Sequence, residues 1–129
     1  MRALDRWHQM MEQGSSEGLM ELLHEDCVFW SPVVHTPQRG RAISYAYLAA
    51  AQQVFNQDFH YVREVVQGDH AILEFECVMD DVKINGVDMI TVQGDQIIDF
   101  KVMVRPLKAV NKVHEKMMAM LEHMKSSAG

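Results

Sequence analysis

The stretch that decides the fold is INGVDMITVQGDQIIDFKVMVRPL, residues Ile84 to Leu107. It holds two runs rich in β-branched and aromatic residues, separated by Gly94-Asp95, a pair that suits a tight hairpin turn. Two further runs of the same kind precede it, and Gly68-Asp69 and Asp80-Asp81 divide them. Asn85-Gly86 is an alternative turn or a bulge. We therefore expect a meander of four antiparallel strands, over residues 58–66, 71–79, 82–93 and 97–105.

The first part of the chain has a helical pattern instead. Apolar residues recur at helical spacing over 3–12, after an N-cap at Ser16, and again over 41–55. A short strand at 27–30 ends before Pro32, which cannot donate a hydrogen bond to a sheet, and 33–40 is predicted as a loop. Pro106-Leu107 begins a last helix. Helices in one block and strands in another predict an α+β fold, with residues 1–129 as one domain.

Composition and charge exclude several classes of partner. The chain has 129 residues and a net charge of -6, with 12 Lys and Arg against 18 Asp and Glu. Nucleic acids and anionic membranes require a dense positive surface, so we expect neither as a partner. No apolar run approaches the length of a membrane span, and the N-terminal residues lack the apolar segment of a signal peptide. Cys27 and Cys77 lie in apolar runs and are interpreted as reduced packing residues, which favours a cytoplasmic protein.

Four segments, in this order of elements, carry a resemblance to a known family: LMELLHEDCVFWSPV (19–33), GRAISYAYL (40–48), INGVDMITV (84–92) and GDQIIDFKVMVRPL (94–107). Together they resemble the nuclear transport factor 2-like superfamily, and within it the SnoaL-like group. The resemblance implies a cystatin-like cone, in which three N-terminal helices lie over the concave face of a strongly curved antiparallel sheet and a C-terminal helix closes it. It also implies a homodimer and a hydrophobic pocket for a small apolar ligand. The superfamily includes isomerases, cyclases, dehydratases and members without catalysis.

The steroid-isomerase branch of the superfamily supplies a test of the site. There, the resemblance implies a proton-carrying Asp before the Pro at the strand end, a hydrogen-bonding Tyr on the first helix, and a protonated Asp on a later strand. Ser31, Trp7 and Asp88 stand at these three positions in this chain. A serine hydroxyl needs a base of its own before it can carry a proton. Ketosteroid isomerase chemistry is therefore not expected, and Ser31 and Trp7 are predicted to line the pocket.

Asp88 is the candidate catalytic acid. It alternates with Ile90 and Val92, so these three side chains share one face of the predicted strand. On an apolar inward face its pKa would be raised and the neutral carboxyl could donate a hydrogen bond to a ligand carbonyl. The alternative is that Asp88 faces solvent or pairs with Arg105 or Lys101 on the next strand.

His35 is the candidate base, because it follows Ser31 in the loop at the expected pocket mouth and histidine is the residue type best suited to exchange protons near neutral pH. The alternative is a solvated loop histidine, or one that caps the helix beginning at Gly40-Arg41. Trp30, Tyr47 and Ile90 are predicted to line the pocket, although core packing explains the aromatic residues equally well. The remaining histidines show no metal-ligand spacing, so we expect no metal and no cofactor.

Two functions follow from these residues. The first is an isomerase, cyclase or dehydratase that acts by proton transfer on a small apolar carbonyl compound, with Asp88 and His35 as acid and base. The second is a non-catalytic module that binds a ligand or a partner protein. The second function remains an alternative because Ser31 stands where the steroid-isomerase branch has its proton-carrying Asp.

Overall fold

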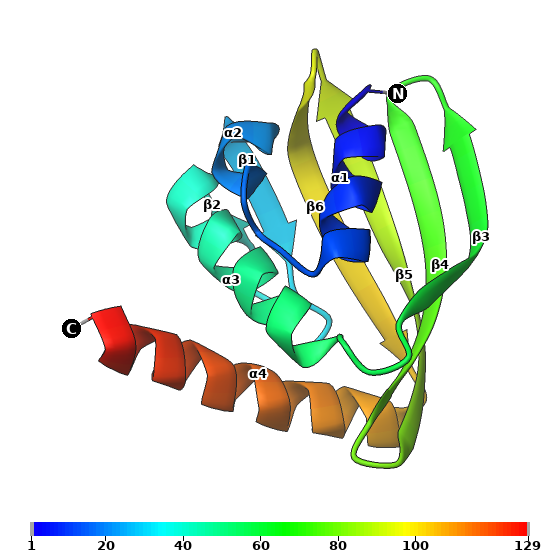
Figure 1. Ribbon diagram of the computed structural model, residues 1–129, viewed down its shortest axis with the longest axis vertical. Helices are drawn as coiled ribbons and strands as arrows, with labels where there is room; N and C mark the ends of the chain where they lie inside the picture. The colour runs from blue at the N-terminus through cyan, green and yellow to red at the C-terminus, as the bar shows by residue number, and fades with distance from the viewer. Residues whose placement is uncertain (1, 129) are drawn as a thin grey trace.

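The computed structural model of the protein describes residues 2–128. Six strands form one curved sheet in the order β2-β1-β6-β5-β4-β3, and helices cover one face and one end of it (Figure 1). The expected α+β fold is confirmed. The elements in chain order are α1 (Arg2–Gln13), α2 (Leu19–Leu22), β1 (Leu23–Trp30), β2 (Gln38–Arg39), α3 (Arg41–Val54), β3 (His60–Gln67), β4 (His70–Met79), β5 (Val82–Gln93), β6 (Gln96–Arg105) and α4 (Leu107–Ala128).

The meander is built as the sequence predicts. β3 to β6 are consecutive antiparallel strands, and each connection falls at a predicted pair of turn residues. Gly68 and Gly94 have φ of 58° and 64°, and Asp80 and Asp81 also adopt left-handed conformations. Asn85-Gly86 is not a turn but lies inside β5. The choice that the sequence left open is therefore settled by the Asp80-Asp81 turn.

The segment before the meander differs from the prediction. Helix α2 begins after Gly18, which is its N-cap and adopts a left-handed φ of 85°. Ser16 is therefore not the N-cap. The helix is a single turn, and β1 consequently begins at Leu23 and not at Cys27. β1 pairs in parallel with β6, a pairing between distant segments that local patterns do not reveal. The short strand β2, within the predicted loop, pairs with the end of β1.

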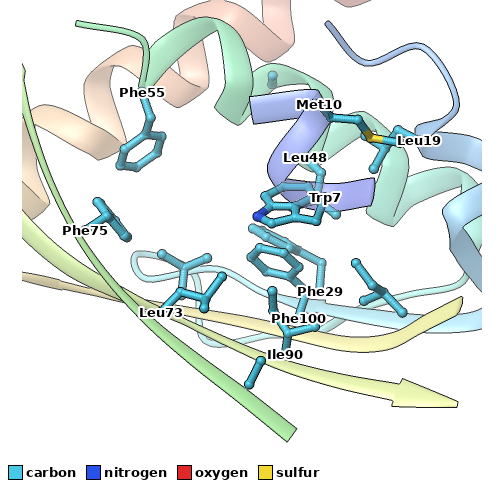
Figure 2. Packing of buried hydrophobic residues seen from close by; sticks show 14 of the residues in the cluster. Trp7, Met10, Leu19, Phe29, Leu48, Phe55, Leu73, Phe75, Ile90 and Phe100 are labelled. Carbon is cyan, nitrogen blue, oxygen red and sulfur yellow. The ribbon is translucent and has the colours of Figure 1, made fainter. Parts of the chain in front are cut away.

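Three helices lie over the concave face of the sheet, and α4 lies along α3 and across one end of the strands (Figure 1). Trp7 from α1, Leu48 from α3 and Phe100 from β6 meet in the core between these layers (Figure 2). Met117 of α4 is buried and Met120 packs beside it against the core, which accounts for much of the methionine content of this helix. Within residues 2–128, no helix is long and apolar enough to cross a membrane.

Candidate functional site: a buried carboxyl at an apolar cavity

Asp88 ends a chain of hydrogen bonds that joins three elements. It lies on the inner face of β5, where it is only 5% exposed. The Tyr61 hydroxyl, from β3, donates a hydrogen bond of 2.7 Å to Asp88 Oδ2. The indole Nε1 of Trp7, from α1, donates one of 2.9 Å to the Tyr61 hydroxyl oxygen. Tyr61 therefore fixes one carboxylate oxygen, and Trp7 fixes Tyr61.

The strand register and one glycine bring Tyr61 to Asp88 across the intervening strand. Tyr61 is paired with Phe75 on β4, and Phe75 is paired with Gly86 on β5. The Phe75 ring lies over Gly86 so closely that a Cβ on that residue would be 2.4 Å from Phe75 Cζ. Because Gly86 has no side chain, the ring occupies this space and the Tyr61 hydroxyl reaches Asp88, two residues further along β5.

Burial controls the ionisation of Asp88 and Tyr61, the two titratable residues in this series of hydrogen bonds. Loss of water raises the pKa of Asp88 to about 7, although the hydrogen bond from Tyr61 lowers it in part. Burial, followed by the neighbouring Asp88 charge, raises the pKa of Tyr61 well above its usual value. At neutral pH Tyr61 is therefore a permanent donor, whereas Asp88 is present in both its neutral and its ionised form.

An apolar cavity of about 40 Å³ lies beside this carboxyl. Helix α3 contributes Leu48, Ala51 and Gln52, and Phe55 at its C-cap continues the spacing of one helical face. In Figure 2, Phe55 and Phe75 lie on the side toward which the indole nitrogen of Trp7 points. The full lining is Trp7, Met11, Leu48, Ala51, Gln52, Phe55, Phe59, Phe75, Asp88, Phe100 and Val102.

A larger groove of about 550 Å³ lies outside this cavity, between α1 and β3. Met11 and Phe59 line both the groove and the cavity, so the two spaces adjoin at these side chains. At the rim, His8 Nε2 and Glu64 Oε1 are 2.5 Å apart and join α1 to β3.

Comparison with known proteins fits this architecture. Residues 4–100 match the family model for the SnoaL-like domain, which covers most of the chain. The chain belongs to the SnoaL-like family. No curated protein matches it.

Solved structures agree with this membership. A steroid delta-isomerase from Pseudomonas aeruginosa is similar at 34% identity and a TM-score of 0.92, with 96% of this chain and 92% of that one covered. An uncharacterised protein with a cystatin-like fold from Silicibacter pomeroyi has 33% identity and a TM-score of 0.84, over 91% and 83% of the two chains. A putative SnoaL-like polyketide cyclase from Jannaschia shares the fold at 12% identity and a TM-score of 0.69, over 87% and 91% of the chains.

In this SnoaL-like chain, Ser31 has a local structural contact. Its Oγ accepts hydrogen bonds from the backbone N–H groups of Val33, at 3.1 Å, and Val34, at 3.3 Å. The preceding Trp30 donates from its indole to Asp99 Oδ1 at 2.8 Å, and the Lys101 ammonium lies 4.7 Å from its ring centre. Neither Ser31 nor Trp30 is among the residues that line the cavity.

The other predicted site residues lie in three different places. His35 is exposed in the loop, Tyr47 packs its ring against Phe29 at 5.5 Å, and Ile90 is buried in the core. None of the three lines the cavity. The structure thus brings together Trp7 and Asp88 alone among the predicted residues.

The pairing considered as an alternative for Asp88 does not form. Arg105 donates to Asn85 Oδ1 at 3.3 Å, and Lys101 lies over Trp30. Among the described residues, Tyr61 is the single hydrogen-bond partner of the Asp88 side chain.

Sequence reasoning missed most residues of the site, among them the polar residues Tyr61 and Gln52. Tyr61 belongs to β3, a strand whose other residues are mostly exposed, so the strand carries no strong inward pattern. Its spacing of two from Phe59 was the available signal. Gln52 follows Leu48 by one helical turn on the inward face of α3, a polar residue in an apolar stripe. Such an interruption is the signal that marks a buried polar contact.

The thiols take no part in this site. Cys27 and Cys77 are both free and buried, as expected of packing residues. Burial raises their pKa values to about 11 and about 12, so both remain neutral thiols near neutral pH.

Proposed function

We propose that this protein is a proton-transfer enzyme of the isomerase or lyase type that acts on a small apolar carbonyl compound, with Asp88 as its acid and base. One observation carries the proposal: a buried carboxyl whose pKa is about 7 lies at the wall of a largely apolar cavity. A catalytic group is most effective when its pKa is near the working pH, because both forms are then available.

The chemistry requires the two forms of Asp88 in turn. The carboxylate removes a proton from the carbon beside the carbonyl, so that a C–H bond breaks, an O–H bond forms on Asp88, and the electron pair enters an enolate. Return of the proton to another carbon gives an isomer. Alternatively, the enolate expels a neighbouring hydroxyl group, which takes the proton from Asp88 and leaves as water.

Tyr61 and Trp7 have positioning roles in this proposal. The bond from Tyr61 holds Oδ2, which leaves Oδ1 as the oxygen for the substrate. A cavity of about 40 Å³ has room for no more than a few water molecules. A substrate therefore needs the cavity to widen, and we infer that it does so at Met11 and Phe59, which also line the adjoining groove, since a thioether side chain adapts readily.

The test is exchange of substrate protons with solvent deuterium. Cyclic ketones and their unsaturated analogues are incubated in heavy water with the wild type, with Asp88→Asn and with the control Asp99→Asn, and exchange is followed by proton NMR. Asp99 lies on β6, where it accepts a hydrogen bond from the half-buried Trp30, and it is outside the cavity lining. We expect exchange with the wild type and the control, and a loss of at least roughly a hundredfold in Asp88→Asn. Equal exchange by all three proteins contradicts the proposal.

A second candidate is a non-catalytic module that binds the same class of ligand. It is favoured by the lack of a further base in the cavity lining, since Ser31 is held in its turn and His35 lies outside. In that case ketones bind the wild type, as seen by ligand-observed NMR, without any exchange of their protons.

We also propose that a second copy of the chain covers the outer face of the meander. Val65 of β3 is paired with Ile72 of β4, and both are exposed. Met103 of β6 is exposed on the same surface, where it lines a shallow depression together with Ile72. Analytical ultracentrifugation is expected to show a dimer for the wild type and a monomer for Met103→Lys; a monomeric wild type contradicts this.

A further inference from the structure

Gln52 is the second polar side chain of the cavity. It lies on α3, is only 8% exposed, and lines the cavity together with Asp88. Its Nε2 donates a hydrogen bond of 3.2 Å to the backbone carbonyl of Ser15. Its Oε1 is fully buried and has no hydrogen-bond partner within residues 2–128. A buried acceptor of this kind is unfavourable unless something else supplies a donor.

The orientation of this amide is fixed by its surroundings. If nitrogen and oxygen were exchanged, Oε1 would face the Ser15 carbonyl oxygen and two acceptors would meet. The other wholly buried polar residue of α3 shows the contrast. Ser44 donates its hydroxyl to the carbonyl oxygen of Cys27 at 3.1 Å, so its bond is made within the protein. Gln52 alone on this helix retains an unused buried acceptor in the described part of the chain.

The two polar groups of the cavity come from opposite layers, because Gln52 is on a helix and Asp88 is on the sheet (Figure 1). The rest of the lining is apolar except for the indole N–H of Trp7, which is already bonded to Tyr61. Phe55, Phe59 and Phe75 supply aromatic walls between the layers. A matching ligand has an apolar body, an oxygen for Asp88, and a hydrogen-bond donor for Gln52.

We propose that Gln52 is a specificity-determining residue, which accepts a hydrogen bond from a hydroxyl group of the substrate, so that the substrate class is hydroxylated carbonyl compounds and not simple ketones. A hydroxyl suits this place better than an amine, because a charged ammonium is costly to bury in an apolar cavity. The claim that the substrate carries a carbonyl group rests on the proposed function of Asp88. The claim that it carries a hydroxyl group rests on the unused acceptor of Gln52.

The test measures a preference within each protein. Dissociation constants are measured by ligand-observed NMR for cyclohexanone and for the three hydroxycyclohexanones, which are isomers of one another. The pH is about 5, where Asp88 is protonated and able to donate. The proteins are the wild type, Gln52→Met, which removes the acceptor, and Gln52→Glu. A neutral Glu retains a carbonyl acceptor and can donate its O–H to Ser15 in place of the amide.

We expect at least one hydroxylated isomer to bind the wild type about two- to tenfold more tightly than cyclohexanone, the range of one net hydrogen bond. The preference should fall to about one or below in Gln52→Met and persist in Gln52→Glu. Because each ratio is taken within one protein, a general loss of stability does not alter it. No preference in the wild type, no binding of any isomer, or an unchanged ratio in Gln52→Met overturns the inference. The deuterium-exchange test of Asp88 uses unhydroxylated ketones and is decided separately.

Discussion

The end of β1 and the middle of β5 treat their polar residues in opposite ways. At the end of β1, Ser31 accepts two backbone hydrogen bonds in its own turn, and Trp30 bonds Asp99. In the middle of β5, Asp88 is surrounded by apolar side chains and has one partner, Tyr61. The polar side chains at the strand end thus have hydrogen-bond partners nearby, whereas the carboxyl at the strand centre has one oxygen, Oδ1, without a hydrogen bond in the described part of the chain. The position that we propose as reactive therefore lies on the interior wall of the cavity and not in the loop after β1.

The largest expected effect concerns stability and pH at Asp88. Its folded pKa of about 7 lies above the ordinary value of 3.8, so the native state binds the proton more tightly and wild-type stability falls as the pH rises through this window. Asp88→Asn is neutral at every pH. Its free energy of unfolding relative to wild type should therefore rise by about 3 kcal/mol between about pH 5 and about pH 9, because this window includes about two pH units below the folded pKa. Urea denaturation at both pH values measures the difference.

Asp80 provides the control for that experiment. It lies in an exposed turn, where the hydrogen bond from Lys116 lowers its pKa, so any stability it contributes is lost only as the pH falls through that lowered value. Between about pH 5 and about pH 9 it is ionised in both states, and Asp80→Asn should show no pH-dependent difference from wild type. The same flat profile for Asp88→Asn would remove the contrast between strand end and strand centre.

Gly86→Ala tests how the cavity wall is packed. The added Cβ would lie 2.4 Å from Phe75 Cζ and 2.7 Å from the Met103 carbonyl oxygen. We expect a loss of about 1–3 kcal/mol in the free energy of unfolding, from overpacking. The loss should be smaller in a Phe75→Leu background, where the ring is absent. Equal losses in the two backgrounds would show that the position of the Phe75 ring does not depend on the missing side chain at Gly86.

Tyr61→Phe sharpens the electrostatic side of the comparison. Removal of the hydroxyl takes away the bond that lowers the Asp88 pKa, so that pKa should move above about 7. The Trp7 N–H also loses its acceptor, and we expect a cost of about 1–3 kcal/mol in stability. A carbon NMR titration of the Asp88 carboxyl measures the shift. Tyr47→Phe, which alters a tyrosine outside the cavity lining, should leave the titration unchanged.

The smallest effects are expected at the strand end. Ser31→Ala removes a turn acceptor and should cost about 1 kcal/mol, and His35→Ala, at an exposed position, should remain within about 0.5 kcal/mol of wild type. Deuterium exchange should be unaffected by both. A large loss of exchange in His35→Ala, without loss of stability, would move the base back to the loop.

The sequence predicted the meander because its information is local. Each turn has its own residue pair, and each strand its own β-branched run. The inward face of Asp88 also followed from strand alternation with Ile90. By contrast, the one-turn helix at Leu19–Leu22 depends on the backbone angle of Gly18, and the parallel pairing of β1 with β6 depends on the whole fold.

The site itself was predictable only in part. Trp7 and Asp88 came from the family resemblance, which carries positions that no spacing rule supplies. Tyr61 reaches Asp88 across β4 because Gly86 gives room to Phe75, a three-strand arrangement that no single segment encodes. Gln52 was visible as a polar break in an apolar helix face, but the missing partner of its oxygen is a property of the packed structure.

The parallel pairing of β1 with β6 has a consequence for how the chain folds. The meander can assemble from neighbouring strands, whereas Leu23 must wait for Ile97, near the other end of the chain. We therefore expect the N-terminal helices to dock onto a sheet that has already formed, so that the cavity is completed late. In that order of events the apolar concave face of the meander would be exposed to water until the helices dock, and we expect aggregation to be most favourable in that interval.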